Sequence, residues 1–225
     1  MKLVLRTLPL VLLAGLFGTG SATADDKNTF PIVFRIADPV SPVVRRAWIE
    51  DQLRQANRVF EPTGIRFRSL EVTPMLERYR DIDTIWARNR LERLVQGGVI
   101  NCFVVGRLRD IHDPALLRRG VHWNVSGESP KHYVILSKIG PPTTMAHELG
   151  HFFGVQGHSS TPGNIMSYMH GPKPAFNEAQ MERIRRTAFT ELRRGRLFTW
   201  QGLMRLRHLR DRAAARLTQK RSTPG

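Results

Sequence analysis

Residues 144–158 constrain this chain more than any other stretch of its sequence. They contain His147, Glu148 and His151 in the pattern His-Glu-x-x-His. Residues four apart on a helix project from the same face, so the two imidazoles can bind one metal ion while the carboxylate lies beside it. A bound metal ion lowers the pKa of water, and a neighbouring carboxylate takes the proton as the water attacks. We therefore predict a helix here that carries two metal ligands and a general base.

The residues that follow extend this pattern. Gly154 lies three residues after His151, where a glycine allows the helix to end in a sharp turn. After such a turn the chain can present a third ligand, and His158 is the candidate. Met166 and Tyr168 come shortly afterwards. Donors further along the chain are an open alternative for the third position: His170, Glu178 and Glu182.

Taken together, these residues resemble the metzincin clan of zinc peptidases, in which a zinc helix, a glycine, a third histidine and a methionine turn follow one another. The resemblance covers residues 143–168. It implies Zn2+ as the cofactor, held by His147, His151 and His158. The family places its third ligand three residues after the glycine, at Gly157 here, so His158 comes one position late. A one-residue insertion in the turn still allows an imidazole to reach the metal.

The resemblance also implies roles for three further residues. Glu148 would be the general base, and Met166 would pack beneath the metal. Tyr168 matches the tyrosine of the astacin and serralysin branches, whose hydroxyl approaches the metal and stabilises the oxyanion. Simpler interpretations stay open: Met166 as a core side chain, Tyr168 as a half-buried aromatic, and the histidine pair as a chance pattern on an amphipathic helix.

The first residues are typical of a targeting segment. Lys2 and Arg6 precede an apolar run at residues 8–17, and the Ala-Thr-Ala sequence ending at Ala24 has the small-x-small form of a cleavage site. The run is too short to favour a membrane span. We predict a signal peptide at residues 1–24 and a secreted or periplasmic mature protein, with an uncleaved anchor as the alternative.

The sequence has a single cysteine, Cys102, so it has no internal disulfide and is not a cysteine-stapled fold. Its apolar neighbours predict a small side chain buried in a strand.

Lysine and arginine exceed aspartate and glutamate by 35 to 19, a formal net charge of +16. Such a surface attracts polyanions, for example lipopolysaccharide, acidic lipids or anionic wall polymers. The sequence carries no zinc-finger or aromatic-basic pattern that favours specific binding of nucleic acid. A proteome that is basic throughout would give the same charge without any such partner.

The first half of the mature chain has a β-α-β pattern. Residues 30–37 are rich in β-branched and aromatic side chains and predict a strand. Residues 65–68 alternate apolar and basic side chains, as in a strand with one solvated face. Between them, residues 43–60 predict a helix, because apolar residues recur at spacings of three and four: Ile49, Leu53, Ala56 and Phe60. This order is typical of parallel strands covered by a helix.

The middle of the chain alternates between helical and strand patterns. Residues 75–96 predict one or two helical pieces. The nearly continuous apolar run at residues 99–105 predicts a strand that is covered on both faces. A long loop follows at residues 106–131, with a short edge strand at residues 121–125 inside it, and residues 132–137 predict a further strand.

Two features of this loop have alternative interpretations. Asp110, His112 and Asp113 are either ligands of a structural cation or a solvated turn, and the turn is favoured because no matching partner cluster appears. The edge strand is either ordinary or a partner for an extended peptide, whose scissile bond it would align over the metal. The metzincin resemblance implies the second role.

The end of the chain predicts a helix and then a basic appendage. Asn177 is a good N-cap for a helix that starts with residues 177–184. Residues 196–225 are rich in arginine and predict a basic helix or tail, which either binds an anionic surface or packs back on the domain. We expect one catalytic domain at residues 25–195. Its fold class is α+β, α/β-like in the N-terminal half, with a metzincin-like twisted mixed sheet, covering helices, zinc helix, methionine turn and C-terminal helix.

These observations give a leading hypothesis and two rivals. The leading hypothesis is an exported zinc-dependent endopeptidase acting on a peptide or protein substrate. The first rival is a basic envelope- or polyanion-binding module with a vestigial or structural metal site, acting through residues 193–221. The second is a metal-dependent hydrolase of something other than protein, such as wall peptides.

Overall fold

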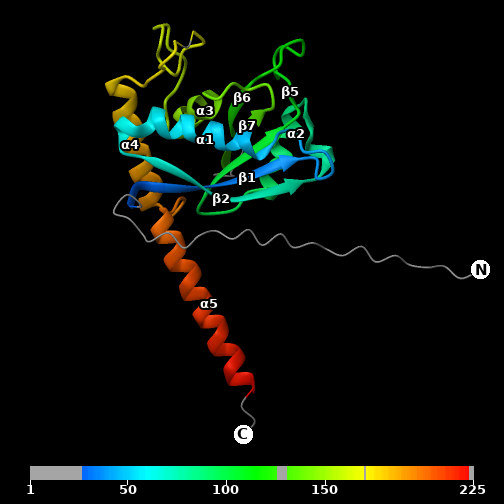
Figure 1. The fold of residues 1–225 in the computed structure, drawn as a ribbon, viewed down its shortest axis with the longest axis vertical. Helices are drawn as coiled ribbons and strands as arrows, with labels where there is room; N and C mark the ends of the chain where they lie inside the picture. The colour runs from blue at the N-terminus through cyan, green and yellow to red at the C-terminus, as the bar shows by residue number, and fades with distance from the viewer. Residues whose placement is uncertain (1–26, 126–130, 170, 223–225) are drawn as a thin grey trace, which may run out of the picture.

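The computed structural model describes residues 27–125, 131–169 and 171–222. The predicted signal peptide at residues 1–24 and the alternative ligand His170 lie outside these ranges. Figure 1 shows a central sheet with helices packed against it and one long C-terminal helix that extends away from the body. No helix of the described residues combines the length and the apolar character that a membrane crossing requires.

The central sheet has five strands in the order β2-β1-β4-β7-β6. β1 (Thr29–Ala37) pairs in parallel with β2 (Arg66–Met75) and with β4 (Ile100–Val105), and β4 pairs in parallel with β7 (His132–Ser137). β6 (Gly120–Asn124) runs antiparallel to β7 and forms one edge of the sheet (Figure 1). The predicted fold class is therefore confirmed, together with the parallel β-α-β start and the short edge strand.

Strand β4 explains why its sequence is almost entirely apolar. Ile100, Cys102 and Val104 pack into one hydrophobic cluster, whereas Phe103 and Val105 pack into a second cluster. Successive side chains of a strand point to opposite faces, so both faces of the sheet are covered at this position. Cys102 is buried with a free thiol, as predicted.

Helices α1 (Arg46–Phe60), α3 (Thr144–Phe152) and α4 (Glu178–Arg193) contribute to the first cluster. The second cluster includes the segment around α2 (Ile85–Arg90), and the short parallel pair β3 (Asp81–Ile82) and β5 (Arg107–Leu108) belongs to the same side. An aromatic group joins the first cluster: Phe60 meets Phe67, Phe153 and Phe176 edge to face, with ring centroids 4.8, 6.1 and 4.9 Å apart. This group fixes the end of α3, and with it the exit of the predicted zinc helix, against α1 and β2.

Several element boundaries differ from the prediction. The helix expected from residue 43 begins at Arg46. The strand expected at residues 65–68 continues to Met75, because β2 pairs with β1 along its whole length and the register shifts once between Ile32 and Val33. The remainder of residues 75–96 contains α2 and three short elements, which are the 3-10 turns Glu77–Tyr79 and Leu91–Leu94 and strand β3. A further 3-10 turn at Glu61–Thr63 closes α1.

The predicted N-cap of the C-terminal helix is present. The Asn177 side chain accepts a hydrogen bond from the Gln180 backbone, and the Gln180 side chain accepts one from the Asn177 backbone, which together form a capping box. Beyond α4, helix α5 (Trp200–Ser222) packs on the domain near its start, where Leu203 is buried with Val33 and Val99. The domain boundary at residue 195 stays a prediction.

Candidate metal centre

A buried glutamine fixes the start of α3. Gln52 lies on α1 and has no exposed surface. Its side-chain oxygen accepts a hydrogen bond from the backbone N–H of Met145 at 3.0 Å, and its amide nitrogen donates to the carbonyls of Gly140 and Pro141. The first N–H groups of a helix have no partner within the helix, so this contact holds the α3 N-terminus in place. Sequence reasoning missed Gln52, although a polar residue three after Ile49 on an apolar helix face was a usable signal.

Glycines shape the turn that follows α3. Gly154 has a φ of 87° and Gly157 a φ of 65°, which are left-handed conformations that side chains disfavour. A Cβ atom at Gly154 would also lie 2.8 Å from the Thr187 hydroxyl of α4. The chain therefore reverses closely against α4 and returns His158 toward the helix.

The structure brings the three predicted histidines together. The ring centroids of His147, His151 and His158 lie 4.9, 5.2 and 5.1 Å apart, and one ligand atom from each lies within 4.8 Å of the others. The one-residue displacement of His158 is thus accommodated by the turn. The alternative donors Glu178 and Glu182 are exposed on α4 and do not belong to this cluster.

Backbone carbonyls orient two of the three imidazoles. The Nδ1 of His147 bonds to the carbonyl of Ile165 at 2.8 Å, and the Nδ1 of His151 bonds to the carbonyl of Val155 at 2.7 Å. Because a carbonyl only accepts, both Nδ1 atoms carry the proton and leave Nε2 free to bind a metal. The Nδ1 of His158 faces the Tyr168 hydroxyl at 3.3 Å. Three neutral imidazole nitrogens form a donor set that fits zinc with one position left open.

Glu148 is buried beside this cluster, with 6% of its surface exposed. Burial raises the pKa of its carboxyl to about 8, and the shift is opposed by a hydrogen bond from the His122 backbone N–H and by the positive charges of Arg118 and Arg88. A carboxyl whose pKa lies near neutrality can both accept and donate a proton under the same conditions.

The methionine turn lies beneath α3. Met166 is fully buried, and a Cβ atom at Gly150 would come within 2.7 Å of its sulfur, so helix and turn are in direct contact. The Met166 backbone N–H bonds to the Asn164 side chain at 2.8 Å, which shapes the turn. Tyr168 differs from the half-buried aromatic considered above, because 69% of its surface is exposed and its ring stacks on His158 with a centroid distance of 4.4 Å.

A cleft of about 1030 Å³ lies over the histidines, and β6 forms one of its walls. The backbone N–H of Ser137 on β7 donates to the carbonyl of Arg119, and the N–H of Val125 donates to the carbonyl of Lys131. Between residues 119 and 125, the backbone N–H and C=O groups of the odd-numbered residues therefore point toward β7, and those of the even-numbered residues point away from it. The contact between the His122 N–H and Glu148 fits this alternation.

Sequence reasoning also missed several residues of the cleft wall. The Nε2 of His122 and the Nδ1 of His132 are hydrogen-bonded at 2.8 Å, and the His132 ring stacks on Phe152 with a centroid distance of 4.1 Å. Burial lowers the pKa of His122 to about 3, so this ring is neutral. His122 and His132 lie on neighbouring strands and are ten residues apart in sequence, so no local sequence pattern predicts their contact.

The loop before β6 contains the predicted turn. Asp110 accepts hydrogen bonds from the backbone N–H groups of His112 and Asp113 at 2.7 and 2.9 Å and forms an ion pair with Arg118. The turn interpretation is confirmed, with Asp110 itself buried rather than solvated. Arg118 was not foreseen as part of the cleft.

Comparisons with known proteins bear on the fold. No protein-family model and no curated protein matches the chain. The crystal structure of metalloproteinase-II from Bacteroides fragilis is similar, with a TM-score of 0.51 at 13% identity over 74% of this chain and 55% of that one. Archaemetzincin from Methanopyrus kandleri gives a TM-score of 0.46 at 16% identity over 71% of this chain and 96% of that one. This chain spans about half the length of the Bacteroides protein. At 13% identity, the likeness to metalloproteinase-II shows a similar fold alone.

Proposed function

We propose that this protein is a zinc-dependent endopeptidase. The observation that carries the proposal is the cluster of three imidazole ligand atoms within 4.8 Å, with a buried carboxylate on the same helix. The ligands would be His147, His151 and His158. The metalloproteinase-like fold supports this assignment.

The donor set determines what the metal supplies. Bound to three imidazoles, zinc would polarise a substrate carbonyl and make water acidic enough to lose a proton near neutral pH. The backbone carbonyls of Ile165 and Val155 hold two of the imidazoles in the tautomer that this requires. Met166, which is buried against Gly150 of α3, would form the packed floor below them.

Two side chains would move protons or stabilise charge. The Glu148 carboxylate takes a proton from the attacking water and then gives it to the leaving amine. The Tyr168 side chain is exposed next to His158, and its hydroxyl would donate a hydrogen bond to the oxyanion as it forms. The outward backbone groups of β6 would pair with an extended peptide and align its scissile bond with Glu148.

Replacing the base without changing its shape tests this proposal. In Glu148→Gln we expect stoichiometric zinc, measured on the purified protein, but hydrolysis of a peptide library reduced by roughly 10²- to 10⁴-fold, the usual contribution of general acid–base catalysis. Glu182→Gln removes an exposed carboxylate from α4 and is the matched control. Undiminished hydrolysis by Glu148→Gln would refute the role of this residue.

Export is a further part of the proposal. The basic start, apolar run and Ala-Thr-Ala sequence favour removal of residues 1–24, which gives a secreted or periplasmic enzyme. Mass spectrometry of the protein purified from its native host should show a chain that begins at Asp25. A chain that retains Met1 would contradict cleavage.

The long C-terminal helix favours a second candidate activity, the binding of a polyanion. Helix α5 extends from the domain (Figure 1), and the side chains of Arg205, Arg210 and Arg212 are exposed on it. Exposed arginines on a protruding helix attract anionic polymers or lipids. Replacing all three arginines by glutamine should weaken binding to lipopolysaccharide while leaving peptide hydrolysis intact. Equal binding by the variant would exclude α5 as the binding element.

A further inference from the structure

The lining of the cleft includes three arginines and a single aspartate close to the metal centre. Arg88, Asp110 and Arg118 all line the cleft, and the charges of both arginines act on Glu148. The charge of Arg118 acts on His158 as well. Arg119 is exposed and lines the cleft too, so three guanidinium groups stand against the carboxyl groups of Asp110 and Glu148, and the cleft has a net positive charge next to the reacting bond.

Arg88 is a buried cation with incomplete hydrogen bonding. Only 3% of its surface is exposed, and its guanidinium lies over the Trp123 ring at 4.8 Å. Its Nη2 donates to the carbonyl of Arg109 at 2.7 Å, whereas its Nε is buried and has no hydrogen-bond partner among the described residues. No carboxylate of the described part of the chain forms an ion pair with it. A buried donor without a partner is costly, so its retention calls for an explanation.

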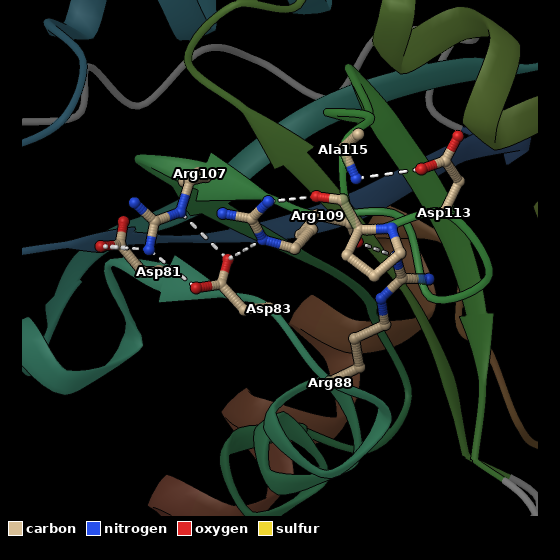
Figure 2. A network of polar contacts seen from close by, with 8 residues as sticks. Asp81, Asp83, Arg88, Arg107, Arg109, Asp113 and Ala115 are labelled. Atoms are coloured by element: carbon tan, nitrogen blue, oxygen red, sulfur yellow. Dashed lines mark hydrogen bonds and ion pairs between the residues drawn. The ribbon is translucent and has the colours of Figure 1, made fainter.

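A polar network holds Arg88 in this position (Figure 2). Arg107 bonds to Asp83 at 3.0 and 2.7 Å and forms an ion pair with Asp81 at 3.2 Å. Asp83 also pairs with Arg109, whose carbonyl receives the Arg88 hydrogen bond. This chain of contacts holds the Arg88 guanidinium at the cleft and keeps the side chain from rotating out to solvent.

Arg118 is held equally firmly but remains accessible. Its side chain is 44% exposed and ion-paired with Asp110, which is itself buried and fixed by two backbone N–H groups. The guanidinium also interacts with the Tyr168 hydroxyl. A planar guanidinium has five N–H donors, so the contact to Asp110 leaves others to bind a ligand. Arg118 can therefore donate to a group in the cleft, and Arg88 adds a charge that water screens poorly.

We propose that Arg118 and Arg88 form a carboxylate-binding subsite, so that the enzyme selects peptides with a carboxylate close to the scissile bond. The carboxylate belongs either to an aspartate or glutamate side chain or to a free C-terminus. Guanidinium groups bind carboxylates through charge-assisted, often paired hydrogen bonds. The inference rests on the proposed peptidase activity, because it names the substrates of that same cleft.

Matched peptides test the subsite. Quenched fluorogenic peptides are made in pairs that differ only by Asp against Asn, or Glu against Gln, at one position around the cleaved bond. Each peptide is also made with a free and with an amidated C-terminus. At the position that the subsite reads, we expect kcat/KM to be about 10- to 100-fold higher for the carboxylate peptide than for its amide counterpart, as one charge-assisted hydrogen bond implies. In Arg118→Gln this ratio should fall to near one, with an intermediate ratio in Arg118→Lys. Arg58→Gln, an equal loss of charge at an exposed position on α1 outside the cleft, should leave the ratio unchanged.

Because both peptides of a pair are compared on the same variant, a general loss of folded or active enzyme does not change the ratio of their kcat/KM values. Binding of the same peptides to zinc-loaded Glu148→Gln, followed by fluorescence anisotropy, provides a readout that does not require cleavage. A preference confined to free C-termini identifies the terminal carboxylate, and a preference for Asp or Glu identifies the side chain. Equal ratios in wild type and Arg118→Gln, or no preference in wild type, overturn the subsite. Carboxylate-selective binding without any cleavage by wild type would support the subsite and refute the peptidase.

Discussion

Gly120 gives the sharpest test of how the edge strand and the proposed general base, Glu148, fit together. It is the first residue of β6, and a Cβ atom built on it would lie 2.7 Å from the Thr144 methyl group, 2.8 Å from Glu148 Cγ and 3.0 Å from Glu148 Oε1. Contacts this short require the neighbours to move. Thr144 and Glu148 belong to the buried helix α3, so the Gly120→Ala substitution should push the carboxylate away from β6.

The expected effect on activity is large compared with the effect on stability. Overpacking costs about 1–3 kcal/mol, and the loss of glycine flexibility in the unfolded chain returns about 0.4–1 kcal/mol. A net loss of about 1–2 kcal/mol lowers the Tm of a chain this long by about 2–8 °C. A displacement of the carboxylate on the order of 1 Å, in contrast, lowers kcat about 100-fold.

Peptide hydrolysis, zinc content and thermal unfolding of Gly120→Ala should therefore be measured on the same preparation. Gly97→Ala is the control, because a Cβ atom there has no neighbour within 4 Å and the φ angle is not positive. We expect normal zinc content in both variants and reduced kcat only in Gly120→Ala. Full activity in Gly120→Ala would refute the close packing of β6 against Glu148.

Other predictions address the support of the site and the stability of the fold. Replacing Gln52 by alanine removes the side-chain partner of the Met145 N–H and of the Gly140 carbonyl, so we expect a loss of about 1–3 kcal/mol in unfolding free energy, measured with denaturant. Gly150→Ala places a methyl group against Met166 and should weaken zinc affinity, measured by competition with a chelator; unchanged affinity would argue against tight packing of the turn. The Asp38 carboxylate accepts hydrogen bonds from the Ser41 and Val40 backbone and from Arg80, and these lower its pKa, chiefly through Ser41. Its stabilising contribution is present above the unfolded pKa of about 3.9 and is lost as the pH falls through the lower folded pKa. The Tm of Asp38→Asn should accordingly be lower than wild type at pH 7 and converge with it on acidification. Removing zinc with a chelator should lower the wild-type Tm, and zinc should restore it, since a ligand of the native state stabilises that state.

Local sequence patterns predicted most of the regular elements. The apolar runs of β1, β4 and β7 and the histidine spacing on α3 are set by neighbours in sequence, so they could be recognised without knowing the fold. The helix cap at Asn177 and the glycine exit at Gly154 were predictable for the same reason. In each case the residue type and its immediate surroundings determine the backbone conformation.

Contacts between distant segments could not be predicted in this way. Strand β2 is longer than its alternating pattern because β1 supplies partners along its length, and Gln52 acts on a helix more than ninety residues later in the chain. The placement of Arg88 in the cleft depends on how α2 and β6 meet in space, where its guanidinium lies over the Trp123 ring. The position of His158 depended on the turn at Gly157, whose left-handed conformation absorbs the additional residue.

X-ray absorption at the zinc edge tests the central claim most directly, because it reports the ligands of the metal without reference to activity. For the wild-type protein we predict three histidine nitrogens at about 2.0–2.1 Å together with one light-atom ligand from solvent. His158→Ala should lose one histidine contribution and bind zinc more weakly. A spectrum of His158→Ala that matches the wild type would contradict the three-histidine centre.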